Sequence, residues 1–240
     1  MKLLTLEGVS KRFAGLKAVS EVSFTVEDGS ISALIGPNGA GKTTCFNLIA
    51  GVLAPSAGRI AFAGRDLAGL EPEQICTLGV ARTFQVVRPL AGMSVLENVT
   101  VGALLRNPSI AGATGEAMRV LEKLGLAAKA AFPASDLTLP DRKLLEVGKA
   151  LATRPKLLLL DEVMAGLRPT EADRMAEVLR GLNRDGLTIL LIEHVMRVVM
   201  ALAQKVVVLH HGEKIAEGTP REITADPRVI ESYLGRRKAA

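Results

Sequence analysis

The distribution of apolar and polar residues along the chain predicts strands that alternate with helices. Three short, almost wholly apolar runs have the character of strands buried on both faces: ISALI at 31–35, KLLLL at 156–160 and LTILLI at 187–192. The segment at 170–186 instead has a helical period. Its apolar residues on one face are Met175, Val178, Leu179 and Leu182. Buried strands separated by helices predict an α/β fold with a parallel sheet.

Other segments fit antiparallel pairs and a helical insertion. LLTLEGVSKRF and VSFTV alternate like edge strands, and VVVLHHGEKIAEG predicts a hairpin around His211-Gly212. TTCFNLIAGVL, after ISALI, predicts a helix. Between about Met93 and Gly148 the pattern turns helical. We therefore expect a core made of residues 1–92 and 149–240, with an antiparallel β subdomain, and an inserted helical lobe at 93–148.

Composition narrows the class of protein. With 240 residues, 48% of them hydrophobic and 23% charged, the chain is long and apolar enough for a globular core. Thirty Lys and Arg against 25 Asp and Glu leave a net charge of +5, which suits an anionic ligand or an acidic membrane surface. The excess is too diffuse to indicate nucleic acid, and 3% aromatic residues without Trp argue against base stacking.

The cysteines and the apolar runs bear on the compartment. Cys45 and Cys76 have neither metal-site spacing nor a disulfide-rich context, so we expect reduced thiols in a cytosolic protein. The N-terminal residues lack the apolar core of a signal peptide, and no apolar run is long enough to cross a bilayer. We expect any membrane role to be peripheral.

The strongest motif is GPNGAGKT at 36–43, a complete G-x-x-x-x-G-K-[ST] between a predicted strand and a predicted helix. Gly39 and Gly41 let backbone amides turn inward around phosphates. Lys42 supplies a charge to the β and γ phosphates, and Thr43 offers a hydroxyl to Mg²⁺. The amides at the start of the following helix add to an anion site.

A second motif is KLLLLDE at 156–162, a buried strand that ends in two carboxylates. Such charges are costly unless they meet a metal or hydrogen-bond donors. Asp161 is placed to hold the Mg²⁺ shell, and Glu162 to polarise a water toward the γ-phosphate. By itself the pattern also fits an ordinary strand end; downstream of a P-loop it favours the functional interpretation.

Two single residues complete the set. Gln85, in ARTFQ, follows a short apolar strand and could reach the metal or the attacking water. His194, in LLIEH, follows another strand at the carboxyl edge, where ligands collect in parallel sheets. His210 and His211 fall in the hairpin turn and are expected to be solvated.

In order and spacing, these motifs resemble those of the ATP-binding cassette (ABC) ATPases over essentially the whole chain. The resemblance is narrower still to the ATPase subunits of branched-chain amino-acid importers. It rests on RTFQ, SVLENV, DEVMAGL, LLIEHVMRVVM and IAEGTPREITADPRVIESYLG. It implies a P-loop NTPase ABC ATPase core of RecA-like type, with an N-terminal antiparallel β subdomain and an inserted α-helical lobe.

The resemblance also implies roles for individual residues. Phe13 would stack on adenine, although without the resemblance it is better interpreted as a buried strand aromatic. Gln85 would sense the γ-phosphate, Asp161 would serve Mg²⁺, Glu162 would be the catalytic carboxylate and His194 would contact the γ-phosphate. The residues implied to bind the ATP phosphates are Gly36, Asn38, Gly39, Ala40, Gly41, Lys42, Thr43 and Thr44.

In the family, two ATPase subunits form a head-to-tail dimer, and each ATP lies between one Walker A loop and the other subunit's LSGGQ signature. The signature aligns here with LTLPD at 137–141. Thr138, which could cap the next helix, keeps a hydroxyl. Pro140 replaces a glycine and removes an N–H, a loss of about 1.5–3 kcal/mol if that N–H serves phosphate. Asp141 adds a negative charge. Val163 and Arg168 also depart from the common residues.

The resulting hypothesis is a peripheral ATPase on the cytoplasmic face of the cell membrane, driving an importer through integral membrane permease subunits. Its partner would be a second ATPase subunit, in a homodimer or a heterodimer. The departures in LTLPD favour a different subunit, with LTLPD forming the weaker site. VVRPLAGMSVL is the candidate docking segment for a permease helix, with lobe core as the alternative. Competing hypotheses are a lipopolysaccharide-exporter ATPase, a soluble ABC ATPase of DNA repair or translation, and a regulatory subunit with little turnover.

Overall fold

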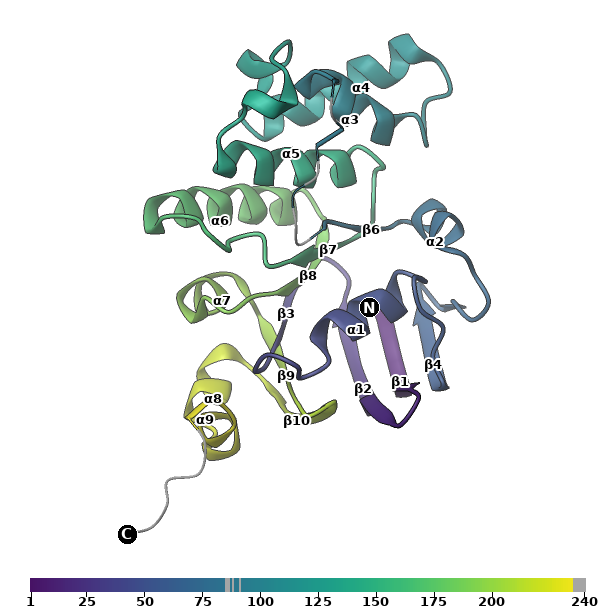
Figure 1. The fold of residues 1–240 in the computed structure, drawn as a ribbon, viewed down its shortest axis with the longest axis vertical. Helices are drawn as coiled ribbons and strands as arrows, with labels where there is room; N and C mark the ends of the chain where they lie inside the picture. Colours follow the sequence, from purple (N-terminus) through teal and green to yellow (C-terminus); the bar gives the residue numbers. More distant parts are fainter. Residues whose placement is uncertain (85–86, 88, 91, 235–240) are drawn as a thin grey trace. The chain divides into compact units, whose positions relative to one another are not determined.

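The structure is a computed structural model that describes residues 1–84, 87, 89–90 and 92–234. The chain divides into two compact units. One consists of Met1–Ile75 with Thr188–Ala240, and the other of Cys76–Leu187 (Figure 1). In the described ranges no helix is long and apolar enough to cross a membrane.

An antiparallel sheet opens the first unit. Its strands lie in the order β2 (Leu16–Glu27), β1 (Lys2–Phe13), β4 (Ala57–Phe62), β5 (Arg65–Asp66). β1 therefore lies between β2 and β4, and its interpretation as an edge strand is wrong. The apolar side chains of β1 alternate into the core, where Leu4, Leu6 and Val9 are buried. Alternation shows only that one face of the strand is buried. Inner and edge strands of an antiparallel sheet both have one buried face, so alternation does not distinguish them.

Parallel strands in the same unit confirm the α/β expectation. β3 (Ile31–Ile35) pairs in parallel with β8 (Thr188–Ile192) on one side and β9 (Lys205–His210) on the other. Every residue of β3 and β8 is buried, as their uninterrupted apolar sequences predict. β9 continues into the antiparallel β10 (Glu213–Gly218), which confirms the hairpin at His211-Gly212.

Helices connect and flank these strands. α1 (Lys42–Ile49) follows β3 and is shorter than the sequence suggests, because Gly51 adopts φ +73 just beyond its C-cap Ala50. The others are α7 (Met196–Leu202), α8 (Pro220–Ala225) and α9 (Pro227–Leu234), and α2 (Pro72–Leu78) spans the boundary between the two units.

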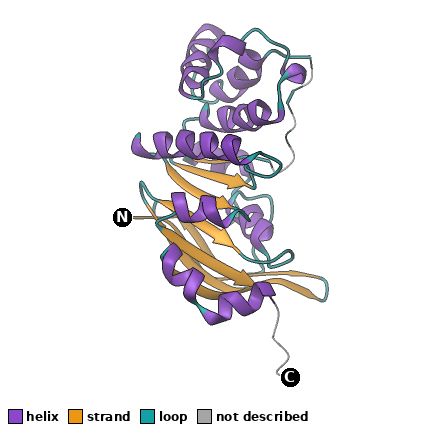
Figure 2. Cartoon of the chain, turned by 90° about the vertical axis from the view of Figure 1, so that its left-hand side faces the viewer, coloured by secondary structure: helices purple, strands orange, loops and turns teal. Residues whose placement is uncertain are grey.

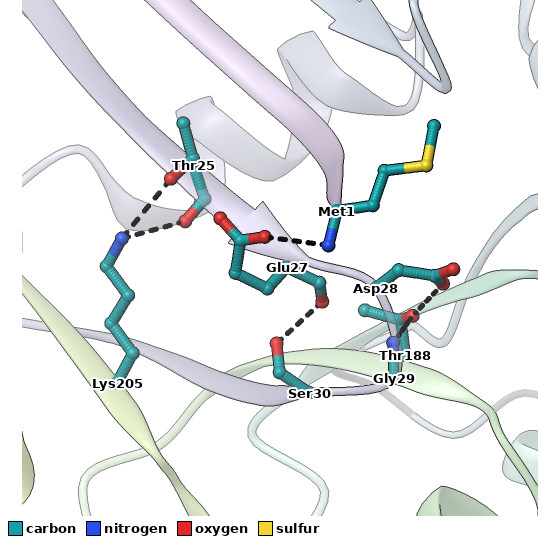
Figure 3. Close-up of polar contacts among 8 residues, drawn as sticks. All are labelled: Met1, Thr25, Glu27, Asp28, Gly29, Ser30, Thr188 and Lys205. Atoms are coloured by element: carbon teal, nitrogen blue, oxygen red, sulfur yellow. Dashed lines mark hydrogen bonds and ion pairs between the residues drawn. The ribbon is translucent and has the colours of Figure 1, made fainter.

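The turn from β2 into β3 is held by polar contacts (Figure 3). The Gly29 N–H donates to Thr188 Oγ1 at 2.9 Å, and the Thr188 hydroxyl donates to Asp28 Oδ1 at 3.2 Å. Lys205 Nζ donates to the carbonyl and hydroxyl oxygens of Thr25 at 3.2 and 3.3 Å (Figure 3). These bonds connect β2 and the turn after it to the first residues of the parallel strands β8 and β9.

The second unit combines a parallel strand pair with helices (purple in Figure 2). β6 (Val80–Arg82) runs parallel to β7 (Leu157–Asp161). Its α-helices are α3 (Val95–Ala103), α4 (Ile110–Lys123), α5 (Leu139–Leu151) and α6 (Pro169–Arg184), with 3₁₀ turns at Ala127–Lys129 and Ala134–Asp136.

Small residues allow the helices α3, α4 and α5 to pack closely. A Cβ added to Gly102 of α3 would lie 2.3 Å from the Lys149 carbonyl oxygen of α5, and one on Gly148 would lie 2.9 Å from Leu124 Cδ1. Met175, Leu179 and Leu182 are buried on one face of α6, as predicted. The expected lobe boundaries, 93 and 148, stay a prediction.

Candidate functional site

The loop GPNGAGKT joins the carboxyl end of β3 to the start of α1 and is organised around a buried lysine. Lys42 is only 6% exposed. Its Nζ donates to the carbonyl oxygens of Gly36 and Pro37, at 2.8 and 3.0 Å. A buried ammonium needs such partners. The loop therefore holds a positive charge at its centre through its own backbone.

The start of α1 presents hydrogen-bond donors. Gly41 is the N-cap with φ +98, and the first turn contains no acidic residue. Thr43 is exposed and Thr44 half-buried, in the first turn, where the amides have no acceptor within the helix itself. Asn38 and Gly39 are exposed, while Gly36 and Ala40 are buried. Ammonium, amides and hydroxyls in one loop, without a carboxylate, fit a polyphosphate chemically.

Neighbouring backbone braces this loop. A Cβ on Gly36 would lie 2.1 Å from the Leu209 carbonyl oxygen, and one on Gly41 would lie 2.5 Å from that of Ala18. The Gly212 N–H donates to the Ala40 carbonyl at 3.1 Å, and the Gly212 carbonyl accepts from the Ser20 N–H at 2.8 Å. The sequence pattern predicts this turn only as a hairpin. Its contribution is to connect β2 to the phosphate loop.

Tyr233 of α9 is another residue that sequence reasoning missed. Burial raises the pKa of the Tyr233 hydroxyl, and a hydrogen bond with the Gly36 backbone opposes that rise. The motif IESYLG contains the tyrosine, but nothing in its spacing indicates this contact.

His194 lies at the same sheet edge as the loop. Leu34 of β3 is in register with Ile192 of β8, so Gly36 and His194 each lie two residues beyond paired positions. His194 is exposed there. This placement is the one predicted from the carboxyl ends of adjacent parallel strands.

Phe13 ends β1 and is 43% exposed, with Lys11 Nζ 5.4 Å from its ring centroid. Its interpretation as a buried strand aromatic is wrong. The ring is available for stacking, and Lys11 already approaches it as a cation.

In the second unit, Asp161 is the last residue of β7 and Glu162 follows it directly. Asp161 is fully buried and forms an ion pair with Arg82, whose Nη2 lies 2.9 Å from Oδ2. Its N–H donates to Thr83 Oγ1 at 3.3 Å. Both partners come from β6 and the residue after it, so the parallel pairing of β6 with β7 places a cation beside the buried carboxylate.

Glu162 is half-buried and has φ +51, in the left-handed region that side chains other than glycine rarely adopt. Such a conformation costs on the order of 1–3 kcal/mol and persists where its surroundings hold it. Its carbonyl accepts from the Ala165 N–H at 3.1 Å, which closes a turn directly after β7. The strain falls on the residue expected to be the catalytic carboxylate.

The LTLPD segment forms the start of α5, with Thr138 at the N-cap position. The prediction that the Thr138 side chain caps the helix is wrong. Its hydroxyl donates to Asp141 Oδ2 at 2.9 Å and accepts no helix N–H. Lys129 forms an ion pair with the same carboxylate. Burial raises the pKa of Asp141, but the hydrogen bonds from Lys129 and Thr138 outweigh it and leave the pKa below its usual value. The charge added by Asp141 therefore has a partner within this unit.

Other predicted positions are only partly covered by the structure. Gln85 lies outside the described residues, as do three positions of the candidate docking segment VVRPLAGMSVL. In the described part of that segment, Leu90 and Met93 are 39% and 38% exposed, while Val95 is buried.

Comparison with known proteins decides the family. Residues 19–165 match the ABC transporter family, and residues 213–239 match the family described as branched-chain amino acid ATP-binding cassette transporter. The chain belongs to the ABC transporter family. The first match covers the phosphate loop of this ABC ATPase and the carboxylates Asp161 and Glu162. The second match covers β10, α8 and α9, the helix that carries Tyr233.

Relatives of this ABC ATPase match over nearly its whole length. The high-affinity branched-chain amino acid transport ATP-binding protein LivG of Salmonella typhimurium is 41% identical, covering 97% of this chain and 98% of the relative. BraF of Pseudomonas aeruginosa, with the same description, is 37% identical over the same shares. A crystal structure of a nucleotide-free ATP-binding cassette from an ABC transporter is 33% identical with a TM-score of 0.90, covering 98% and 100%. The predicted family and fold class are confirmed.

Proposed function

We propose that this ABC ATPase is the ATP-binding and ATP-hydrolysing motor subunit of a membrane importer for branched-chain or related small amino acids. The observation that carries the proposal is the end-to-end similarity to transport ATP-binding proteins such as LivG and BraF. The separate match at residues 213–239 supports the branched-chain class, because it lies outside the general cassette match.

ATP binds to the phosphate loop in this proposal. The Lys42 ammonium donates to the β and γ phosphates. It either gives up its bonds to the carbonyls of Gly36 and Pro37 or donates to those carbonyls and the phosphates together. Phe13, exposed at the end of β1, stacks on the adenine. The residues that offer amides or hydroxyls to phosphate are Gly36, Asn38, Gly39, Ala40, Gly41, Thr43 and Thr44.

Mg²⁺ is the proposed metal cofactor, and oxygen donors suit it. Thr43, Gln85 and Asp161 are the residues that would hold it or its water ligands. When bound, Mg²⁺ neutralises charge on the phosphates. Asp161 already pairs with Arg82, so the buried carboxylate keeps a cationic partner independently of the metal.

Hydrolysis needs a proton acceptor beside the attacking water. Glu162 takes that proton as the water oxygen bonds to the γ-phosphorus and the bond to the bridging oxygen breaks, which leaves ADP and phosphate. His194 donates to the γ-phosphate, and Gln85 orients the water.

The proposed assembly contains this chain, a second ATPase subunit and integral membrane permease subunits, on the cytoplasmic face of the cell membrane. Thr138 at the start of α5 faces the ATP held by the second subunit. Its hydroxyl bond to Asp141 competes with phosphate, and Pro140 offers no N–H, so this signature forms the weaker site of a heterodimer. The exposed Leu90 and Met93 support permease docking by their segment.

The test uses the whole transporter, captured from membranes through a tag on this chain and reconstituted in lipid. Permease subunits should be captured with it, and a branched-chain amino acid delivered by its binding protein should stimulate ATP hydrolysis. Glu162→Gln should lower kcat by about 10²-fold or more while ATP affinity stays within about twofold, because general-base catalysis alone is worth about 10²–10⁴.

Three results would overturn parts of the proposal. Capture without any permease would favour a soluble ABC ATPase. Hydrolysis that stays negligible in the complete, substrate-loaded transporter would favour a regulatory subunit. A Glu162→Gln transporter that hydrolyses ATP at the wild-type rate would remove the catalytic role from Glu162.

A further inference from the structure

A buried lysine of α5 contacts the residue after Asp161. Lys143 is 6% exposed, and its Nζ donates to the Glu162 carbonyl oxygen at 3.2 Å. Both residues belong to the second unit. A long cationic side chain is seldom buried unless its ammonium is satisfied, so this contact belongs to a specific arrangement rather than to a solvated helix face.

The Lys143 ammonium donates to the carbonyl oxygen of Glu162, in a strained part of the backbone. The Glu162 carbonyl accepts from Lys143 Nζ and from the Ala165 N–H at 3.1 Å. The same residue has φ +51. Two donors on one carbonyl set the orientation of its peptide plane, and that plane determines the direction in which the Glu162 side chain leaves the strand.

A second contact joins α5 to the same turn. A Cβ placed on Gly166, which has φ +80, would lie 3.2 Å from Leu139 Cδ2 at the start of α5. Val163 and Met164, between Glu162 and Gly166, are buried. The segment after β7 is therefore in contact with α5 near the start of the helix and again at Lys143.

We propose that Lys143 is a positioning residue that holds Glu162 in its catalytic orientation and thereby couples the start of α5 to the hydrolytic carboxylate. The inference rests on the proposed function, in which Glu162 accepts the proton and Thr138 meets the ATP of the second subunit. Thr138 and Lys143 are five residues apart, about 7.5 Å along the helix axis. A shift of α5 on engaging that ATP moves Lys143, and with it the Glu162 peptide.

The chemistry of the contact suggests informative variants. Methionine keeps the apolar stem of lysine as far as Cε, but it ends there and has no group that could donate to the Glu162 carbonyl. Arginine keeps a charged donor. Glutamine remains polar but is one bond shorter, so its amide falls short of the carbonyl. Lys149 lies on the same helix and pairs with Glu146, which makes Lys149→Met the matched control.

The experiment measures kcat, ATP affinity and melting temperature in the reconstituted transporter. Lys143→Met should lower kcat about tenfold or more with ATP affinity within about twofold, since a displacement of about 1 Å costs on the order of 10²-fold. Lys143→Arg should recover at least about a third of the wild-type kcat, and Lys149→Met should match the wild type. In the Glu162→Gln background, Lys143→Met should change the residual rate by less than about twofold, because its effect passes through Glu162.

The outcomes separate this inference from the proposed function. Wild-type kcat in Lys143→Met, or equal losses of kcat and ATP affinity, would overturn the positioning role even if Glu162→Gln is inactive as proposed. A further large loss in the Glu162→Gln background would also overturn it. If Lys143→Met does not fold, Lys143→Gln decides: lowered kcat with preserved ATP affinity supports the role, and wild-type kcat refutes it. An active Glu162→Gln transporter refutes the proposed function instead.

Discussion

Lys42 and Lys143 have the same exposure, 6%, and both donate to backbone carbonyls of segments that follow a strand. Only Lys42 could be predicted. Its place in G-x-x-x-x-G-K-T defines its function by spacing within one loop. Lys143 lies in a helix, and the helical period explains only where the apolar residues of that helix fall. The partner of the Lys143 side chain, Glu162, is 19 residues away. Nothing local to Lys143 indicates that contact.

Gly212 gives a prediction at the same scale. Gly212→Ala places a methyl group 2.9 Å from the Ala18 carbonyl oxygen at a residue with φ +82, so the turn must shift and its bond to Ala40 weakens. We expect ATP affinity to fall about tenfold, equivalent to about 1.4 kcal/mol, measured by titration with a fluorescent nucleotide. Gly64→Ala is the matched control, with φ +79 and open space around its Cβ. Equal affinities for the two variants would show that the turn does not brace the loop.

Among the elements, the buried parallel strands were the most predictable, and the partners of side chains at helix starts were the least. β3 and β8 coincide with uninterrupted apolar runs because both of their faces are covered. The start of α5 lies at Thr138, as predicted, but the hydroxyl donates to Asp141 because Lys129 holds that carboxylate close by. A cap position is a property of local sequence, whereas the partner of its side chain depends on the residues that fold against it.

An ion pair between Arg154, in the segment after α5, and Glu116 of α4 gives a prediction for the helices. Arg154 donates to Glu116 and lowers the pKa of Glu116 to about 2, with Arg119 also contributing. A lowered carboxyl pKa means stability that is present above about pH 4.5 and is lost as the pH falls toward about 2. Glu116→Gln should therefore lower the free energy of unfolding by about 1 kcal/mol at pH 7, because Arg154 is half-exposed.

Urea unfolding at several pH values checks this. The difference between wild type and Glu116→Gln should shrink between about pH 5 and pH 3. Glu122→Gln, at an exposed position on the same helix, is the control and should show no such trend. A difference that stays constant across this range would mean that the Glu116 carboxylate charge does not stabilise the helices.

At the scale of the whole molecule, the assembly gives the remaining prediction. Pro140 lies in the first turn of α5, where an amide has no partner within the helix. Pro140→Gly returns an N–H to the signature, so ATP affinity of the complete transporter should rise by about tenfold or more, and turnover should rise with it, because one charge-assisted hydrogen bond is worth about 1.5–3 kcal/mol. Pro220→Gly, in the first turn of α8, controls for the loss of a proline at a helix start. Unchanged affinity and turnover in Pro140→Gly would count against a weakened signature.

The sequence by itself determined the α/β class, the phosphate loop, the two carboxylates at the end of β7 and directly after it, and the place of His194, because each depends on residues adjacent in the chain or on strand ends. The similarity of the sequence to known relatives also identified the family, the ABC transporters. Only the tertiary structure decided which backbone braces the loop, which cation accompanies Asp161 and which lysine contacts Glu162. These contacts join residues that are 19 to 194 positions apart: Lys143 and Glu162, Arg82 and Asp161, Ala40 and Gly212, Ser20 and Gly212, and Ala18 and Gly212. Periodicity and spacing describe short segments, and chain folding alone brings such partners within hydrogen-bond reach.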